Sequence, residues 1–176
     1  GTFTFTSSVP VSVVALRGLT NERSDFLITT LPVASLTPRT DDTIFFPHFA
    51  DGGGWTTQVI LVNPTDATIT GMVQFLDQGS VTTPAIPVSL TLTDGQIGSD
   101  FAYSIPPRSS RRLQTSNPAA VSVGSVRVVK TAGTATPSGL GIFSLASGGV
   151  TVAEAGVPAL PTSSAFRMYA EVTGTP

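Results

Sequence analysis

The sequence predicts an all-β fold: an antiparallel β-sandwich, Ig-like or jelly-roll-like, with an internally duplicated three-strand unit. Short runs rich in β-branched and aromatic residues recur along the 176 residues, at a spacing of roughly ten residues that is typical of sandwiches. Turn-forming pairs such as Asp94-Gly95 and Pro106-Pro107 separate these runs. No window carries the 3.6-residue apolar stripe of an amphipathic helix.

The expected strands alternate in polarity or are apolar throughout. Residues 2–6 alternate threonine and phenylalanine, which places Phe3 and Phe5 on one face of a strand. Residues 9–16 are almost continuously apolar, as in a strand covered on both sides. The other expected strands are 26–31, 43–46, 56–62, 68–76, 86–92, 102–105, 121–129, 140–145, 150–153 and 166–172.

Composition narrows the range of functions. The chain is 40% hydrophobic and only 11% charged, so it can bury a sizeable core. A net charge of -2 argues against nucleic acid as a partner, because Arg108, Arg111, Arg112 and Lys130 are too few for a phosphate-binding face. Cysteine is absent, which excludes disulfides and thiolate metal sites, and no apolar stretch is long enough to span a membrane. The many threonines and serines and the scarcity of lysine favour an extracellular, secreted protein.

An internal repeat relates residues 1–36 to residues 124–160. Residues 1–5 match 124–128 in pattern, 11–16 match 140–145, 25–30 match 149–154, and 31–36 match 156–160. Each copy therefore reads as a strand, an apolar second strand, a polar loop, a third strand and an exit through proline. Such repetition of a supersecondary unit indicates duplication or stacking.

The repeat suggests a division of the chain into three parts. Residues 1–46 resemble the closing strands of a first, partial sandwich, and residues 47–164 form the main sandwich. Residues 165–176 supply the opening strand of a further unit, or a strand that completes the first. Either the chain is circularly permuted, with both ends completing one sandwich, or the two halves complete neighbouring subunits.

Several segments carry a resemblance to a known group of proteins. Residues 46–64 read FPHFADGGGWTTQVILVNP, and residues 103–113 read YSIPPRSSRRL. Shorter matches are SGLGIF at 138–143, EAGVPA at 154–159 and NERSDFLITT at 21–30. These segments resemble uncharacterised secreted bacterial proteins built of tandem β-sandwich (Ig-like) repeats. The resemblance implies a secreted or surface location and tandem sandwiches, and it implies no particular activity.

The residues that could support catalysis or metal binding favour structural roles. His48 is the sole histidine and lies between Phe46, Pro47 and Phe49, and the serines include no Gly-x-Ser-x-Gly elbow. Asp41, Asp42 and Asp51 lack the spacing of a calcium loop, and the glycines that follow Asp51 predict a tight turn. We therefore expect no enzyme activity, no catalytic residues, no metal and no cofactor.

Carbohydrate binding is the alternative that the aromatic residues raise. Trp55, with Tyr103 and Tyr169, could form a platform on which a sugar stacks, although a lone tryptophan at a strand start is more often packed beneath a turn. The threonines of residues 131–136 are candidates for O-linked sugars, but solvated threonines on a β-face are the better explanation for any single site.

Two functional hypotheses follow from this sequence. The first is a structural subunit of a pilus-like surface filament, assembled by donation of a β-strand to a neighbour. The donor or interface residues would be Phe3, Phe5, Phe166 and Met168, and the partners would be further copies or neighbouring repeats. The second is an adhesive or carbohydrate-binding module of a larger secreted protein, with Trp55 as the glycan contact.

Overall fold

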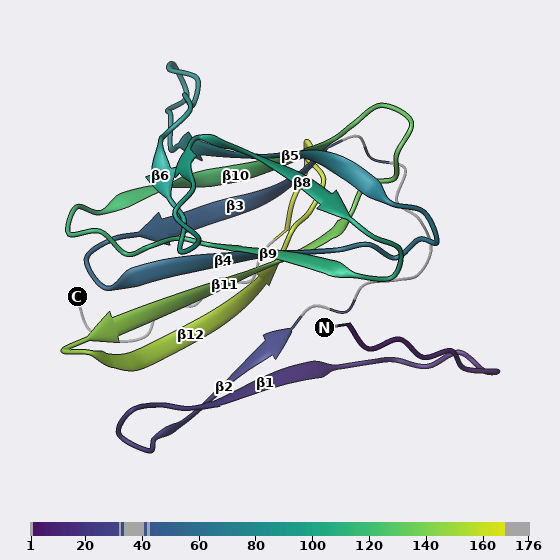
Figure 1. Ribbon diagram of the computed structural model, residues 1–176, viewed down its shortest axis with the longest axis horizontal. Helices are drawn as coiled ribbons and strands as arrows, with labels where there is room; N and C mark the ends of the chain where they lie inside the picture. Colours follow the sequence, from purple (N-terminus) through teal and green to yellow (C-terminus); the bar gives the residue numbers. More distant parts are fainter. Residues whose placement is uncertain (1, 32, 34–40, 42, 168–176) are drawn as a thin grey trace.

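Two four-stranded antiparallel sheets pack face to face in the computed structural model, which describes residues 2–31, 33, 41 and 43–167 (Figure 1). All regular elements within these residues are β-strands, so the predicted all-β sandwich is confirmed. The first sheet contains, in spatial order, β3 (Thr43–Asp51), β10 (Ser122–Lys130), β5 (Ile69–Asp77) and β8 (Asp100–Ile105). The second contains β12 (Val150–Pro158), β11 (Ser138–Ser147), β4 (Trp55–Val62) and β9 (Ser110–Gln114).

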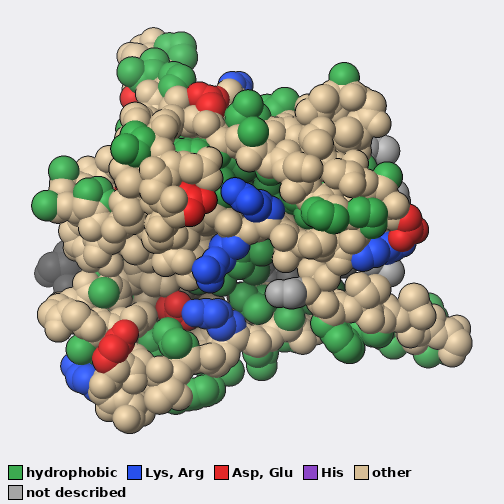
Figure 2. Space-filling view, in the orientation of Figure 1, with side chains coloured by type: hydrophobic (Ala, Val, Ile, Leu, Met, Phe, Trp, Pro, Cys, Tyr) green, Lys and Arg blue, Asp and Glu red, His purple; other side chains and the backbone are tan. Residues whose placement is uncertain are grey.

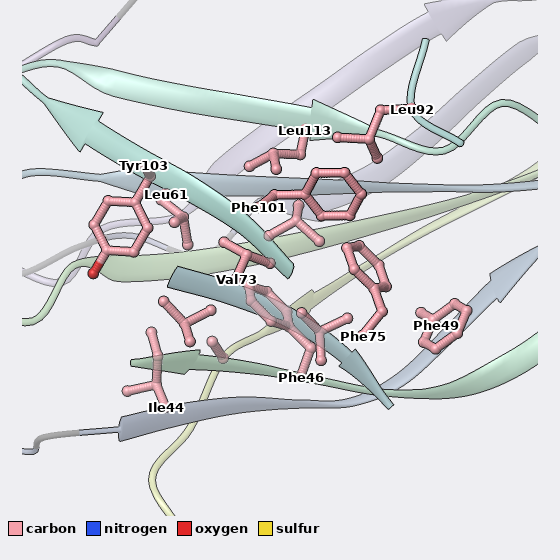
Figure 3. Close-up of a cluster of buried hydrophobic side chains, with 14 of the residues drawn as sticks. Ile44, Phe46, Phe49, Leu61, Val73, Phe75, Leu92, Phe101, Tyr103 and Leu113 are labelled. Atoms are coloured by element: carbon pink, nitrogen blue, oxygen red, sulfur yellow. The ribbon is translucent and has the colours of Figure 1, made fainter. Parts of the chain in front are cut away.

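The core between the sheets follows from alternation along each strand. In β8, Phe101, Tyr103 and Ile105 are buried while the residues between them are exposed. The ring of Phe75 lies edge-on to Phe49 at 5.2 Å and to Phe101 at 5.8 Å between centroids (Figure 3). Because three different strands supply these rings, the cluster joins β3, β5 and β8 into one face.

A third layer lies below the second sheet. β1 (Ala15–Thr20) and β2 (Phe26–Leu31) pair with each other from Ala15↔Leu31 to Thr20↔Phe26, and we call residues 15–31 the N-terminal hairpin. In Figure 1 this hairpin lies beneath β12, so the layers run from the first sheet through the second sheet to the hairpin. A further sheet contains only two very short strands, β6 (Leu90–Thr91) and β7 (Ile97–Gly98), and it lies at one end of the sandwich.

The outward faces of the two sheets differ in chemistry. On the first sheet, Arg127 donates through Nε to Gln74 Oε1 at 2.7 Å, and Gln74 Nε2 donates to Asp100 Oδ1 at 2.5 Å. Hydrogen-bonded polar side chains of this kind are typical of a sheet face that contacts solvent. The outward face of the second sheet instead carries buried apolar side chains, Leu140 and Ile142, beside a few polar ones, and the N-terminal hairpin lies against it.

The repeat predicted from the sequence has a partial counterpart in the fold. Its second and third strands form a hairpin in both copies, β1 with β2 and β11 with β12. The first strands differ, because residues 124–128 lie in β10 whereas residues 2–6 belong to no strand. The division of the chain at residues 46 and 164 stays a prediction.

Some expected strands differ from the observed ones, because a strand forms only where a partner strand pairs with its backbone. Residues 9–14 were expected to be covered on both sides, but they are exposed and the strand begins only at Ala15, where β2 supplies a partner. Within residues 86–92, Leu90–Thr91 form a strand with the equally short β7, whereas Pro87 and Leu92 form only isolated bridges with Leu76 and Thr115. β9 was not predicted, because its serine and arginines lack the apolar pattern of a strand. It forms an edge strand beside β4.

Candidate functional site: the N-terminal hairpin and the face it covers

The face beneath the N-terminal hairpin is assembled from three adjacent strands. Side chains at positions 139 and 141 would point at Phe46 in the core, so Leu140 and Ile142 point away from the core. The register sets Leu140 opposite Ile60 and Ile142 opposite Gln58, and it sets Ser144 opposite Glu154. We call this surface the docking face; its members are Gln58, Ile60, Val62, Leu140, Ile142, Ser144, Glu154 and Gly156.

The docking face is buried although it lies outside the core. Leu140 is 8% exposed and Ile142 is 2% exposed, values that an outward side chain reaches only beneath another layer. That layer is the N-terminal hairpin, whose Arg17 and Thr29 point toward the sheet. The second sheet therefore buries apolar side chains on both sides, which is the pattern of a middle layer, although its outward side also carries Gln58, Ser144 and Glu154.

Gly156 allows the closest approach between the hairpin and the sheet. The carbonyl group of Thr30 occupies the space into which a side chain at position 156 would project. The amide of Gly156 donates to Thr29 Oγ1 at 2.9 Å, so β2 lies against β12 at this point. A glycine is needed here for its lack of a side chain, because any Cβ would collide with backbone.

A buried carboxylate fixes the position of the hairpin. The Glu154 side chain is 4% exposed, and its Oε2 accepts from Arg17 Nε at 3.0 Å. Its Oε1 accepts from Arg17 Nη2 at 3.3 Å and from Ser144 Oγ at 2.9 Å. Both oxygens are thus occupied, which a buried carboxylate requires, and the two-point contact with a guanidinium sets direction as well as distance.

The loop of the N-terminal hairpin makes a second polar contact with β12. Glu22 Oε2 accepts from the amide of Thr151 at 2.7 Å, and Asn21 Nδ2 donates to the Thr151 carbonyl at 2.9 Å. The hydrogen bond from the Thr151 amide lowers the pKa of Glu22 below its usual value. Because β12 is an edge strand, these side chains satisfy backbone groups that an edge leaves unpaired.

The opposite face of the N-terminal hairpin is open and apolar. Leu16, Phe26 and Ile28 share it, and they are 58%, 68% and 59% exposed. Figure 2 shows hydrophobic side chains at the surface along the lower part of the molecule, where β1 and β2 lie. The hairpin therefore carries apolar side chains on both faces, and its own chain covers one of them.

Two of the predicted interface residues, Phe3 and Phe5, lie beside this hairpin. Phe3 and Phe5 contact each other at 6.1 Å between ring centroids and line a groove of about 410 Å³ with Ile60, Val62 and Leu140. The predicted strand at residues 2–6 is absent, and Phe3 is 88% exposed. Phe166 is also exposed and outside any strand, and Met168 lies outside the described residues.

The aromatic residues proposed for sugar stacking do not come together. Tyr103 lies in the core, where burial raises the pKa of its hydroxyl to about 12, so it contributes nothing to a surface. Trp55 is half-buried at the start of β4, opposite Leu145, and Tyr169 lies outside the described residues. A three-residue platform is therefore excluded, and Trp55 alone stays a candidate.

The remaining candidates occupy structural positions. His48 is exposed on β3, with its ring 5.6 Å from Phe143. Asp51 is fully buried and accepts from the amide of Asn117 at 2.8 Å, at the turn that its glycines predicted. Arg108 pairs with Asp66 at 2.7 Å rather than joining an open basic patch. Within residues 2–31 and 43–167, no group of three or more potential ligands among His, Cys, Asp and Glu is suited to a metal ion.

Known proteins offer no close counterpart. The chain matches no family model, curated protein or solved structure significantly. Among the described residues there is also no helix that could cross a membrane. The functional argument therefore rests on the N-terminal hairpin and its contacts.

The sequence missed the residues that hold the hairpin in place. Arg17 is far in the chain from Glu154 and Gly156. Although the latter two residues belong to the EAGVPA segment, that segment does not indicate a contact with the hairpin. One signal was present: residues 26–31 place large apolar side chains on both faces of the strand, with Phe26 and Ile28 on one and Leu27 and Leu31 on the other. Such a strand is expected between two layers.

Proposed function

We propose that this chain is an extracellular structural protein, a subunit or repeat of a cell-surface fibre, in which the N-terminal hairpin joins neighbouring β-sandwiches. The observation that carries the proposal is that this hairpin is apolar on both faces. Its inner face covers the second sheet, and its outer face presents Leu16, Phe26 and Ile28 to solvent. A contiguous exposed apolar surface of this kind marks an interaction site.

A further β-sheet is the partner that fits this outer face. The three side chains project from two paired strands, so they form a flat ridge that matches the pleated face of another sheet. The hydrogen-bonded outward face of the first sheet is a poor match, because Arg127 and Asp100 would lose water without gaining partners. On a second copy, the uncovered apolar sheet face is the outer face of its own N-terminal hairpin, which is therefore the better partner.

Residues 2–14 have the features of a strand that is donated to the sheet of a neighbouring copy. They lie outside every strand in the described part of the chain, and they alternate or cluster apolar residues such as Phe3, Phe5 and Val14. Pairing with an open sheet edge would satisfy their backbone groups and bury these side chains. The extracellular location is proposed from the composition and from the resemblance to secreted tandem-repeat proteins.

An adhesive or glycan-binding role has less support. It would depend on Trp55 alone, because Tyr103 is buried in the core. O-linked sugars on residues 131–136 would be compatible with either role.

Size-exclusion chromatography with light scattering and electron microscopy of the full chain would test the proposal. We expect concentration-dependent association of the wild-type chain, and we expect Phe26→Ser with Ile28→Thr to weaken it at least tenfold. Burial of one large apolar side chain contributes about 1.5–3 kcal/mol, so losing two has a large effect. The substitutions leave Arg17, Glu154 and the docking face unchanged.

The matched control removes apolar surface elsewhere. Val81→Thr with Ile97→Thr changes two exposed side chains that lie away from the hairpin, and it is expected to leave association unchanged. A wild-type chain that stays monomeric at the highest soluble concentration would refute the proposal. So would equal weakening by both pairs of substitutions.

A further inference from the structure

The N-terminal hairpin is a self-contained element. Its two strands pair only with each other, from Ala15↔Leu31 to Thr20↔Phe26. Among the described residues, the hydrogen bonds between this hairpin and the sandwich all involve side chains of Arg17, Asn21, Glu22 or Thr29. The hairpin can therefore leave the sandwich as a unit, without the loss of a single backbone ladder.

Leaving the docking face uncovered, in contrast, would raise the free energy of the folded chain. Removal of the hairpin would expose Leu140 and Ile142, and it would leave the Glu154 carboxylate without its guanidinium. The Glu154 carboxylate accepts hydrogen bonds on both oxygens while the hairpin is docked. Without the hairpin it would keep only the hydrogen bond from Ser144. The docking face therefore fits a hairpin that makes these same contacts.

We propose that the docking face also accepts the N-terminal hairpin of a second copy of this chain, so that exchange of hairpins links neighbouring copies. The contacts of Arg17 with Glu154, of Glu22 with Thr151 and of Thr29 with Gly156 are the same whether both partners belong to one chain or to two. Exchange of an identical element is a low-cost route to association, because it creates no new interface.

The balance between the two arrangements depends on local concentration. The chain from Leu31 to Thr43 has a maximum span of roughly 40 Å at full extension. Copies that already associate through Leu16, Phe26 and Ile28 hold each other's hairpins close by, which favours exchange. To this extent the inference rests on the proposed function, although it concerns the opposite face of the hairpin.

Isotope-mixed cross-linking of the full chain tests this exchange. The variant Arg17→Lys keeps the positive charge beside Glu154 and introduces an amine that a carbodiimide joins to the Glu154 carboxylate at zero length. Unlabelled and ¹⁵N-labelled copies of this variant are mixed at high concentration, incubated and cross-linked. Mass spectrometry of the peptide pair that joins residues 17 and 154 then separates same-label from mixed-label products.

The expected result is a mixed-label fraction that rises with concentration and incubation time toward about one half, as random pairing of equal pools requires. The same mixture, kept dilute and cross-linked after the same time, reports the products that form within single chains. A mixed-label fraction at high concentration no higher than that of the dilute sample would overturn the proposal.

A charge-reversal pair provides a second and independent measurement. The variants Arg17→Glu and Glu154→Arg each place like charges together within one chain, whereas a mixture restores opposite charges at both docking faces only by reciprocal exchange. Native mass spectrometry should show a heterodimer in the mixture at least tenfold above either homodimer. Equal amounts of heterodimer and homodimer would contradict exchange.

The two proposals fail in different ways. If the wild-type chain associates and Phe26→Ser with Ile28→Thr weakens that association, but no mixed-label product forms, exchange is wrong and the apolar interface stands. If mixed-label products form equally with and without those substitutions, exchange stands and the apolar interface is wrong.

Discussion

Gly156 shows how one residue fixes the position of a whole layer. It lies on the edge strand β12, where the Thr30 carbonyl takes the place of a side chain and the amide donates to Thr29. Other glycines of the chain are required by positive φ angles at turns, as at Gly148 and Gly149 between β11 and β12. Gly156 is required by space alone, so its role is invisible in the sequence.

We predict that Gly156→Val displaces the N-terminal hairpin without unfolding the sandwich. The new side chain would collide with the backbone of β2, and overpacking of this kind costs about 1–3 kcal/mol. Limited proteolysis should cleave residues 15–31 several-fold faster than in the wild-type chain. Gly98→Val is the control, because a side chain there meets no atom closer than 3.8 Å, and unchanged cleavage in Gly156→Val would contradict the close approach.

At the scale of the element, the hairpin and the sheets are held by different forces. The sheets share continuous ladders, such as the seven Cα pairs from Gly124↔Asp77 to Lys130↔Gly71 between β10 and β5. The hairpin is attached to the sandwich by an ion pair, a few side-chain hydrogen bonds and the apolar contact over Leu140 and Ile142. An element with few backbone connections opens at a lower free energy than the rest.

Native-state hydrogen exchange should resolve this difference. We expect amides of β1 and β2 to exchange at least tenfold faster than those of β4 and β10, because opening of the hairpin breaks no ladder of the sandwich. Mass spectrometry of peptides from each element measures the rates in one experiment. Equal protection of the hairpin and of β10 would show that the two unfold together.

The whole molecule depends on the aromatic cluster between its sheets. Phe75 is fully buried and lies between Phe49 and Phe101, which come from the two other strands that the cluster joins. Its removal would open a cavity at the centre of the first sheet, where the neighbouring strands have little freedom to collapse.

We predict that Phe75→Ala lowers the free energy of unfolding by about 3–5 kcal/mol in urea titrations. Met72→Ala is the matched control, since Met72 lies on the same strand but points outward and is partly exposed. That substitution should cost well under 1.5 kcal/mol. Comparable losses in both variants would mean that the cluster is not the centre of the core.

Alternation along single strands could be read directly from the sequence. The period-two pattern predicted β8 and β10, and the residues Ser147, Gly148 and Gly149 predicted the turn between β11 and β12. The repeat predicted two strands separated by a polar loop within residues 11–36, and the structure has β1 and β2 there, with β1 beginning four residues later than predicted. These features depend on near neighbours in the chain, which is why the sequence alone sufficed.

Tertiary structure alone decided which face each segment covers. The contacts of Arg17 with Glu154 and of Thr30 with Gly156 join residues more than a hundred positions apart, and no local pattern specifies such a distance. Likewise, residues 2–14 have strand-like sequences but no strand, because a strand exists only where a partner satisfies its backbone. The sequence by itself determined the all-β sandwich; the third layer, with its open apolar face, emerged only from packing.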